Sequence, residues 1–296
     1  MNNEINQYLK EKKQLIDISL PEYITKLRAP EILKKSMVYS LKAGGKRLRP
    51  ILLMASIEAL GHDGQKGIET ACALEMIHTY SLIHDDLPAM DNDDLRRGQP
   101  TNHKVYGDAT AILAGDALLT YAFECIAGID HPDIDNDMKM ALIQKLANAA
   151  GPEGMVGGQQ DDLTAEGKSL TIQELQSIHL RKTGRLLCFA VEAGAILGQA
   201  NEQQAENLSD FAKHLGIAFQ IKDDILDIIG DEITLGKPVG SDVTNNKNTY
   251  PKLLTLEGAK EKMNKHADAA LHYLKAANVD SYRLQQLMGY VLDRNH

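Results

Sequence analysis

Residues 82–97 have the sequence Leu-Ile-His-Asp-Asp-Leu-Pro-Ala-Met-Asp-Asn-Asp-Asp-Leu-Arg-Arg, and the rest of the chain is best interpreted from this stretch. Five aspartates lie between positions 85 and 94, at the end of an apolar helical pattern, and two arginines follow them directly. Adjacent carboxylates raise one another's pKa unless a cation neutralises them, and carboxylate oxygens suit Mg²⁺. The stretch therefore predicts a magnesium site, with Arg96 and Arg97 as its anion-binding half.

Pro88 determines how the aspartates of this first Asp motif can meet. Asp85 and Asp91 are six positions apart, so on a straight helix they would point about 240° from each other. Proline cannot continue the backbone hydrogen bonding of the preceding turn, and we therefore expect the helix to end or kink near Leu87. A helix end at this point would let Asp91 return towards Asp85.

A second Asp motif follows as Gln-Ile-Lys-Asp-Asp-Ile-Leu-Asp at residues 220–227, again at the end of a long apolar helical pattern. Asp223 and Asp227 are four positions apart, which places them on one helix face. A single acidic run is commonly a solvated loop. Two such motifs at helix ends instead favour a cavity that is lined with carboxylates.

The two motifs together resemble those of the short-chain trans-prenyl diphosphate synthases, most closely the bacterial farnesyl enzymes, and further matches run from about Lys42 to Leu256. The resemblance implies an isoprenoid-synthase helical bundle around a central cavity, usually in a homodimer. It implies condensation of isopentenyl diphosphate with dimethylallyl and geranyl diphosphate to give farnesyl diphosphate and diphosphate. It also implies about three Mg²⁺ ions in each active site.

The resemblance assigns roles to individual residues as well. It implies metal ligands at Asp85, Asp86, Asp91, Asp223 and Asp227. It implies diphosphate binding by Lys46, Arg49, His78, Arg96, Arg97 and Lys237. It implies catalytic roles for Lys182, Thr183 and Gln220, and control of product length by Tyr80 and Ser81.

The residues alone support these assignments unequally. The segment Gly-Gly-Lys-Arg-Leu-Arg-Pro at residues 44–50 could bind a diphosphate, because glycine allows close approach and a helix N-terminus adds positive potential. A basic turn is, however, more often simply solvated. His78 lies two turns before Asp85, and a lone histidine in an apolar helix is more often a hydrogen-bonded core residue. A helical lysine such as Lys182 usually extends to solvent, and Asp161 and Asp162 are expected to be structural or to support the site.

Tyr80 and Ser81 precede Asp85 by five and four positions. A helix rises about 1.5 Å per residue, so their side chains are expected about 6–7 Å below the metals, where an allylic tail would grow. An ordinary core aromatic explains Tyr80 equally well from the sequence alone. The resemblance favours the role in product length.

Composition narrows the class of protein. The formal net charge of −9 and the pI of about 5.6 argue against nucleic-acid binding, which normally leaves a basic footprint. The three cysteines are dispersed, so they indicate neither a disulfide framework nor a zinc site, and they fit a reducing cytoplasm. We expect no membrane span and no secretory signal. No linker or repeat is evident, so we predict a single domain over residues 1–296.

Helical periodicity covers nearly the whole chain, and convincing alternation of the kind found in strands is absent. Pro21 and Pro30 are expected to punctuate the N-terminal region. The expected helices cover residues 4–18, 31–41, 67–87, 109–127, 138–150, 172–197 and 202–229, with another opening near Pro50 and two or three more after Pro251. The sequence therefore predicts an all-α bundle.

Other functions stay open at this point. A geranylgeranyl diphosphate synthase would share both motifs. A helical His/Asp metal phosphohydrolase could use His84 and Asp85, but it would need further histidine ligands and leaves the second motif unexplained. A terpene cyclase typically lines its cavity with aromatic residues, and here the aromatic content is 5% with no tryptophan. A non-catalytic partner subunit would be expected to have lost one Asp motif, whereas both are present.

Overall fold

The structure, a computed structural model, describes residues 3–229 and 248–293. Within these ranges helices dominate, which confirms the predicted all-α class. The chain divides into two compact units. The first comprises Met1–Met54 and Asp63–Ile143, and the second comprises Ala55–His62 and Gln144–His296. A single domain over residues 1–296 stays a prediction.

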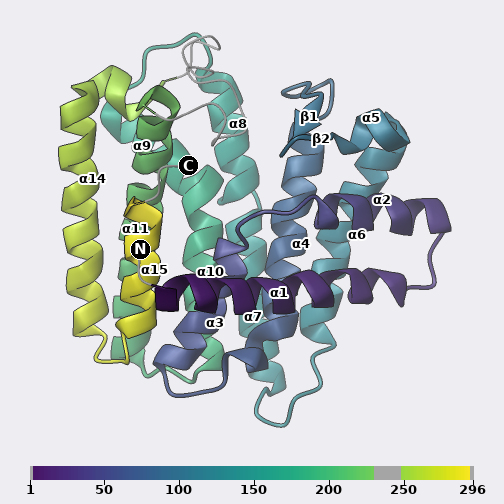
Figure 1. The fold of residues 1–296 in the computed structure, drawn as a ribbon, viewed down its shortest axis with the longest axis horizontal. Coiled ribbons are helices and arrows are strands. Elements are labelled where there is room, and N and C mark those ends of the chain that lie inside the picture. The colour runs from purple at the N-terminus through teal and green to yellow at the C-terminus, as the bar shows by residue number, and fades with distance from the viewer. Residues whose placement is uncertain (1–2, 230–247, 294–296) are drawn as a thin grey trace. The chain divides into compact units, whose positions relative to one another are not determined.

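The first unit contains the N-terminal helices and the helices on either side of the first Asp motif. Its elements are α1 (Asn3–Thr25), α2 (Glu31–Lys42), the first half of α3 (Leu48–Ala59), the short helix η1 (Gly64–Gly67), α4 (Ile68–Asp85), α5 (Asn102–Tyr106), α6 (Asp108–Ala127) and the first half of α7 (Asn136–Ala150). Figure 1 shows α1 beside α2 and α4 beside α6, in agreement with their packing contacts. Most side chains of α4 are buried, as expected of a helix that is apolar on all sides.

Helix α1 continues past Pro21, where the sequence predicted a break. Proline removes the amide that would bond to the carbonyl one turn earlier, which normally ends or kinks a helix. Leu20 and Ile24 are fully buried on either side of Pro21. Burial of these two side chains offsets the missing hydrogen bond, so tertiary packing outweighs the local signal.

A small hairpin that the sequence did not predict follows the first Asp motif. Strands β1 (Leu95–Arg96) and β2 (Gln99–Pro100) pair antiparallel, with Arg96 opposite Gln99. Arg97 and Gly98 form the two-residue turn and both have positive φ, of 55° and 76°. A two-residue turn with positive φ at both positions matches the twist of paired strands. The turn therefore gives Arg97 a backbone conformation that few residues adopt.

The second unit begins with the last residues of α3 and contains the helix of the second Asp motif. Its elements include α8 (Met155–Ala165), α9 (Ile172–His179), the π-helical turn η2 (Leu180–Gly184), α10 (Arg185–Leu197), α11 (Glu202–Ile229), α14 (Tyr250–Ala276) and α15 (Tyr282–Asp293). Figure 1 shows α11 beside α14, and the two pack along most of their length. The helix that the sequence predicted over residues 172–197 is present as α9 and α10, with η2 between them.

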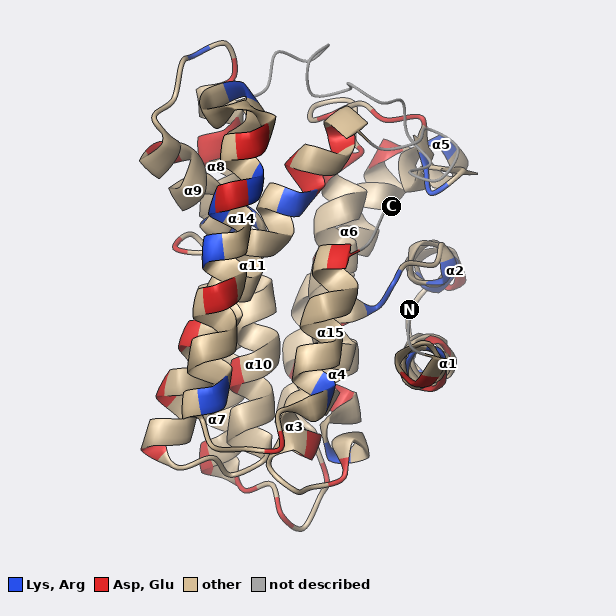
Figure 2. Ribbon diagram, turned by 60° about the vertical axis from the view of Figure 1, so that its left-hand side comes forward, with Lys and Arg blue, Asp and Glu red and all other residues tan. Residues whose placement is uncertain are grey.

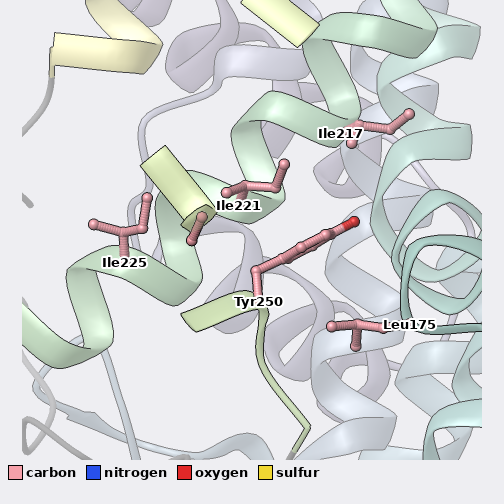
Figure 3. Close-up of a cluster of buried hydrophobic side chains, with 6 residues drawn as sticks. Leu175, Ile217, Ile221, Ile225 and Tyr250 are labelled. Carbon is pink, nitrogen blue, oxygen red and sulfur yellow. The ribbon is translucent and has the colours of Figure 1, made fainter. Parts of the chain in front are cut away.

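A hydrophobic cluster holds the end of α11 against the start of α14 and against α9. Its labelled members come from three helices and lie around the ring of Tyr250 (Figure 3). They are Leu175, Ile217, Ile221, Ile225 and Tyr250, joined by Ala259. Full burial of an aliphatic side chain contributes about 1.5–3 kcal/mol to folding. The cluster therefore supports the helix segment that carries the second Asp motif.

His214 of α11 and His266 of α14 form a hydrogen-bonded pair, with their Nδ1 atoms 2.9 Å apart. One ring must donate and the other accept, so the bond requires at least one neutral imidazole. Burial, the His214 ring and Lys262 lower the pKa of His266 to about 4. Burial and Lys213 also lower the pKa of His214, against the opposing effect of Asp210.

We expect this pair to make the second unit less stable in acid. Both histidines bind protons more weakly in the folded chain than in the unfolded chain, where histidine titrates near about pH 6.5, so protonation favours unfolding. The free energy of unfolding should fall as pH is lowered from about 7 towards 4. Urea titrations at several pH values measure the effect. His266→Gln should flatten the slope, whereas the control His272→Gln on the same helix should keep it.

Helix α6 is the one helix among residues 3–229 and 248–293 that is long and apolar enough to cross a membrane by length and composition alone. The core helix of a soluble protein meets the same criterion. Ala111, Ala114, Gly115 and Leu118 of α6 are buried within the first unit. The small residues among them let α4 approach closely.

Candidate active site

The first Asp motif turns back on itself as Pro88 predicted. Helix α4 ends at Asp85, and the amide of Asp91 donates a hydrogen bond of 2.9 Å to the carbonyl oxygen of Asp85. The amide of Asn92 similarly bonds to Leu87, at 3.1 Å, and Asn92 has a positive φ of 52°. The turn therefore brings Asp91 back to the end of the helix that carries Asp85. Asp91 is exposed and Asp85 half-buried.

Asp86 lies differently from its neighbour, because its side chain is buried and holds Arg96. The Arg96 guanidinium donates from Nε to Asp86 at 2.7 Å and 2.9 Å, and its Nη2 lies 2.5 Å from Asp86 Oδ1. Burial raises the pKa of Asp86 against the opposing effect of Arg96. The carboxylate of Asp86 thus orients Arg96, and both residues line a small cavity of about 30 Å³ together with Thr79, Ile83 and Arg97.

The donor set of this motif fits Mg²⁺ that is held jointly with a substrate. No group of three or more histidine, cysteine or acidic side chains suited to a metal occurs within residues 3–229 and 248–293. Mg²⁺ is commonly bound by only one or two carboxylates, with waters and substrate phosphates completing its octahedron. Asp85 and Asp91, joined by their backbone hydrogen bond, supply a pair of this kind.

The basic loop, residues 43–47 between α2 and α3, lies against the end of the first Asp motif. Arg97 donates from Nη1 to the carbonyl oxygen of Gly44. Gly45 has a φ of 126°, and a Cβ at this position would come within 2.7 Å of Arg97 Nη1. Glycine is therefore required twice here, by backbone conformation and by the approach of the guanidinium. Lys46, next in the loop, is exposed.

Arg49 and His78 meet in the same unit. Arg49 Nη1 lies 3.4 Å from His78 Nε2, although Arg49 follows the basic loop and His78 lies on α4. Burial and the Arg49 guanidinium hold the pKa of His78 well below its ordinary value. His78 is therefore neutral near pH 7, so it can accept a hydrogen bond from Arg49 at Nε2 and donate from the other ring nitrogen.

Tyr80 is a buried side chain on α4, with 5% of its surface exposed. Its ring stands edge-on to the His84 ring, with the centroids 5.7 Å apart. His84 Nε2 in turn lies 3.1 Å from the carbonyl oxygen of Ile112 on α6. Gly115 of α6 makes room for this histidine, because a Cβ there would overlap the His84 ring. The ring of Tyr80 therefore packs against a side chain that is itself held by α6.

Ser81, the second residue predicted to control product length, bonds within its own helix. Its hydroxyl donates to the carbonyl oxygen of His78 at 2.9 Å. A hydroxyl that bonds one turn back lies close to the helix backbone. Of Tyr80 and Ser81, only Tyr80 therefore has a side chain large enough to limit the length of an allylic tail.

The second Asp motif lies near the end of α11, in the second unit. Asp224 is 4% exposed and accepts a hydrogen bond of 2.9 Å from the backbone amide of Tyr250 at the start of α14. Gln220 Nε2 lies 3.4 Å from the other oxygen of Asp224. Asp227 is also buried, at 2% exposure, whereas Asp223 is half-buried. Asp224 therefore joins α11 to α14 and orients Gln220.

Lys182 and Thr183 lie in the π-helical turn η2, which the sequence did not reveal. Such turns insert one extra residue into a helix and are frequent at functional sites. Lys182 Nζ lies 2.6 Å from Asp162 of α8, and Arg181 Nη2 lies 2.6 Å from Asp161. Figure 2 shows acidic and basic segments beside each other near α8. Asp161 and Asp162 thus have the supporting role that the sequence predicted.

Gly158 explains how α8 comes so close to η2. A Cβ at Gly158 would overlap the backbone of Lys182. Glycine at this position therefore lets the two elements touch, and it positions Asp162 beside Lys182. Lys237, to which the resemblance assigns diphosphate binding, lies outside the described residues.

Comparisons with known proteins identify the family of the chain. The family profile named polyprenyl synthetase matches residues 30–288. The chain is 57% identical over 292 residues to the farnesyl diphosphate synthase of Geobacillus stearothermophilus, covering 99% of this chain and 98% of that protein. It is 51% identical over 296 residues to the farnesyl diphosphate synthase of Bacillus subtilis (strain 168), covering 100% of both chains.

Solved structures show the same fold. The crystal structure of an apo FPP/GFPP synthase from Zymomonas mobilis matches with a TM-score of 0.85 and 37% identity, covering 99% of this chain and 100% of that chain. The geranylgeranyl pyrophosphate synthetase from Pyrococcus horikoshii matches with a TM-score of 0.85 and 33% identity, covering 99% of each chain. The predicted isoprenoid-synthase fold is confirmed, and the chain belongs to the polyprenyl synthetase family.

Proposed function

We propose that this chain is a farnesyl diphosphate synthase, which adds isopentenyl diphosphate to dimethylallyl diphosphate and then to geranyl diphosphate. The observation that carries the proposal is the hydrogen bond from Arg97 to the Gly44 carbonyl oxygen. Because of this contact, the basic loop lies directly beside the end of the first Asp motif, whose carboxylates are of the kind that bind Mg²⁺. A metal-bound diphosphate and a second diphosphate held by cations require this juxtaposition. The names of the full-length bacterial relatives support the farnesyl product.

Members of this family use a divalent metal. We propose that Asp85, Asp86 and Asp91, with Asp223 and Asp227 of the second motif, bind about three Mg²⁺ ions by way of the allylic diphosphate. When bound, Mg²⁺ neutralises the diphosphate and so favours its departure as an anion. Asp86 also orients Arg96, because both of its carboxylate oxygens accept hydrogen bonds from that guanidinium.

Positive side chains of the protein stabilise the charge that develops on the leaving diphosphate. We assign this role to Arg96, whose guanidinium pairs with Asp86, and to Lys182, whose ammonium pairs with Asp162. Lys237 is proposed for the same role by resemblance. Preorganised donors of this kind are effective because they need little rearrangement during the reaction.

Isopentenyl diphosphate is the nucleophile and needs no ionisation. We assign its diphosphate to Lys46, Arg49, His78 and Arg97, because guanidinium forks hold phosphate oxygens directly. After the new carbon–carbon bond forms, a proton must leave the adjacent carbon. The departed diphosphate is the proposed base, and Thr183 and Gln220 orient the reacting groups; the hydrogen bond from Gln220 to Asp224 supports a fixed orientation for that amide.

Replacing Arg49 by alanine is expected to raise the Michaelis constant for isopentenyl diphosphate about tenfold or more, because a charge-assisted hydrogen bond to phosphate is lost. The constant for geranyl diphosphate should change much less. Steady-state kinetics with each substrate varied in turn measures both constants. If the allylic constant changes more, the two diphosphate assignments are exchanged.

One assay tests the whole proposal. The protein is incubated with Mg²⁺, isopentenyl diphosphate and either dimethylallyl or geranyl diphosphate, and the dephosphorylated products are separated by chain length. A fifteen-carbon product from both starters supports the proposal, whereas twenty carbons would indicate a geranylgeranyl diphosphate synthase. Release of phosphate without condensation would indicate a phosphohydrolase.

We also propose a homodimer in the cytoplasm. Helix α6 leaves Ile112 and Leu113 exposed, at 43% and 58%, while its opposite face packs on α4. Burial of such an apolar face against a second copy would remove it from water, which favours association. Sedimentation equilibrium should show twice the mass of one chain.

The cysteines support the proposed location in the cytoplasm. All three thiols are buried and none forms a disulfide, which suits a reducing compartment.

A further inference from the structure

Arg47 is a cation of the basic loop that the proposed function does not use. Its neighbour Lys46 is exposed, whereas Arg47 is 4% exposed. It has a positive φ of 51°, a conformation that non-glycine residues adopt uncommonly. Burying an arginine is costly unless its charge and its N–H groups find partners. The partners of Arg47 therefore indicate what its burial achieves.

The Arg47 guanidinium joins three helices of the first unit. Nε donates to Asp17 of α1 at 2.8 Å, and Nη1 donates to Glu75 of α4 at 2.7 Å. Nη2 donates to the carbonyl oxygen of Leu41, near the end of α2, at 2.5 Å. The planar fork of arginine can hold three such partners in fixed directions, which the ammonium of lysine cannot do. We refer to Asp17, Arg47 and Glu75 as the Arg47 network.

Helix α1 holds the basic loop at a second point. Lys13 Nζ lies 2.8 Å from Asp17 Oδ2 and donates to the carbonyl oxygen of Gly45 at 2.9 Å. Lys13 and Asp17 are one helical turn apart, so a single face of α1 carries both contacts. The loop is therefore fixed on both sides of Lys46, at Gly45 and at Arg47.

The pair of Arg47 and Glu75 also sets the position of the loop along α4. Glu75 is 2% exposed and lies three residues before His78, so the two side chains share a face of that helix. His78 in turn meets Arg49, with 3.4 Å between the two nitrogens. A buried ion pair often adds little to stability, and its better-supported use is to specify one register among alternatives.

We propose that the Arg47 network positions the basic loop against α4, so that Lys46 and Arg49 meet the diphosphate of isopentenyl diphosphate together with His78. Asp17 and Glu75 touch no substrate and act through Arg47. The inference rests on the proposed function of the basic loop and names further residues on which that function depends. The affinity for one of the two substrates is therefore the property that the network controls.

Glu75→Gln is the first test, because it removes one charge from the network and keeps the shape of the side chain. We expect the Michaelis constant for isopentenyl diphosphate to rise about tenfold, since misplacement by a fraction of an ångström weakens positioned contacts. The constant for geranyl diphosphate should change less than about twofold. Glu22→Gln is the matched control, because it removes a carboxylate from an exposed ion pair on α1. Equal changes in both constants would overturn the proposal.

A double variant separates positioning from stability. Arg47→Met with Glu75→Leu removes both buried charges, and Asp17 keeps Lys13 as its partner. Replacing a buried ion pair by apolar side chains of similar volume is often neutral for stability. We expect a melting temperature near that of the unchanged protein, with the raised Michaelis constant for isopentenyl diphosphate retained. A stable double variant with ordinary kinetics would overturn the proposal, because the basic loop would then be positioned without the network.

Arg49→Ala, measured in parallel, distinguishes failure of this inference from failure of the proposed function. If Arg49→Ala raises the constant for isopentenyl diphosphate and the network variants do not, the positioning role is wrong and the substrate assignment stands. If Arg49→Ala leaves that constant unchanged, the substrate assignment itself is wrong. A rise in all of these variants, with the Glu22→Gln control unchanged, supports both.

Discussion

Replacement of Asp85 by asparagine is expected to lower the turnover number about a hundredfold or more while the protein stays folded. The amide has nearly the shape of the carboxylate but lacks the negative charge that a divalent cation needs. Asp85 is half-buried at the end of α4, and its backbone carbonyl, which bonds to Asp91, is unaffected by the change. Loss of metal affinity with an intact turn is therefore the expected result.

The measurement is turnover with saturating substrates over a series of Mg²⁺ concentrations, with far-ultraviolet circular dichroism as the check on folding. Asp223→Asn should behave in the same way if the second motif shares the metals. Asp94→Asn is the matched control, because Asp94 belongs to the same acidic run but is exposed and paired with Lys104 at 2.7 Å. Near-normal turnover of Asp85→Asn at saturating Mg²⁺ would falsify the metal assignment.

Replacement of Tyr80 by alanine is expected to move the product from fifteen carbons to twenty or longer. The buried ring of Tyr80 fills space five residues before Asp85 on α4, and packed interiors tolerate little extra volume. Forcing part of a prenyl unit against the ring would cost about 1–3 kcal/mol by overpacking. Alanine removes that obstacle, so growth should continue past the second condensation.

Chromatography of the dephosphorylated products is the measurement. Tyr80→Phe is the control, because it keeps the ring and its edge-on contact with His84 and removes only the hydroxyl. It should still give fifteen carbons. An active Tyr80→Ala variant that keeps a fifteen-carbon product would show that another residue limits the chain. The same result would leave the metal and diphosphate assignments unaffected, since these depend on other residues.

Local chemistry in the sequence was sufficient for much of the fold. Helical periodicity located α4, α6 and α11 to within a few residues, because the pattern of apolar residues is repeated every turn. Pro88 alone predicted the turn that joins Asp91 to Asp85, since a missing amide hydrogen acts on its immediate neighbours. The family likewise followed from the two Asp motifs, whose residue types and spacing are continuous in the chain.

The interruption at Lys182 and the small hairpin at Arg97 were not predictable in this way. A π-helical turn adds one residue to a helix but requires no particular amino acids. The turn at Leu180–Gly184 therefore leaves no mark in the helical periodicity of residues 172–197. The turn is stabilised by α8, through Gly158 and Asp162, which are distant in sequence. The hairpin has strands of only two residues, too short for alternation to be recognised.

The sequence by itself determined which residue types are available to bind Mg²⁺ and diphosphate. Tertiary structure decided which of several chemically similar residues is exposed and which is buried in an ion pair. Lys46, Arg47 and Arg49 are indistinguishable as cations of one short segment, yet Arg47 is buried by Asp17 and Glu75 while Lys46 is exposed. Asp86 differs from Asp85 in the same way, through Arg96. The physical reason is that a charged side chain takes its role from its partners, and these partners come from other helices that only folding brings near.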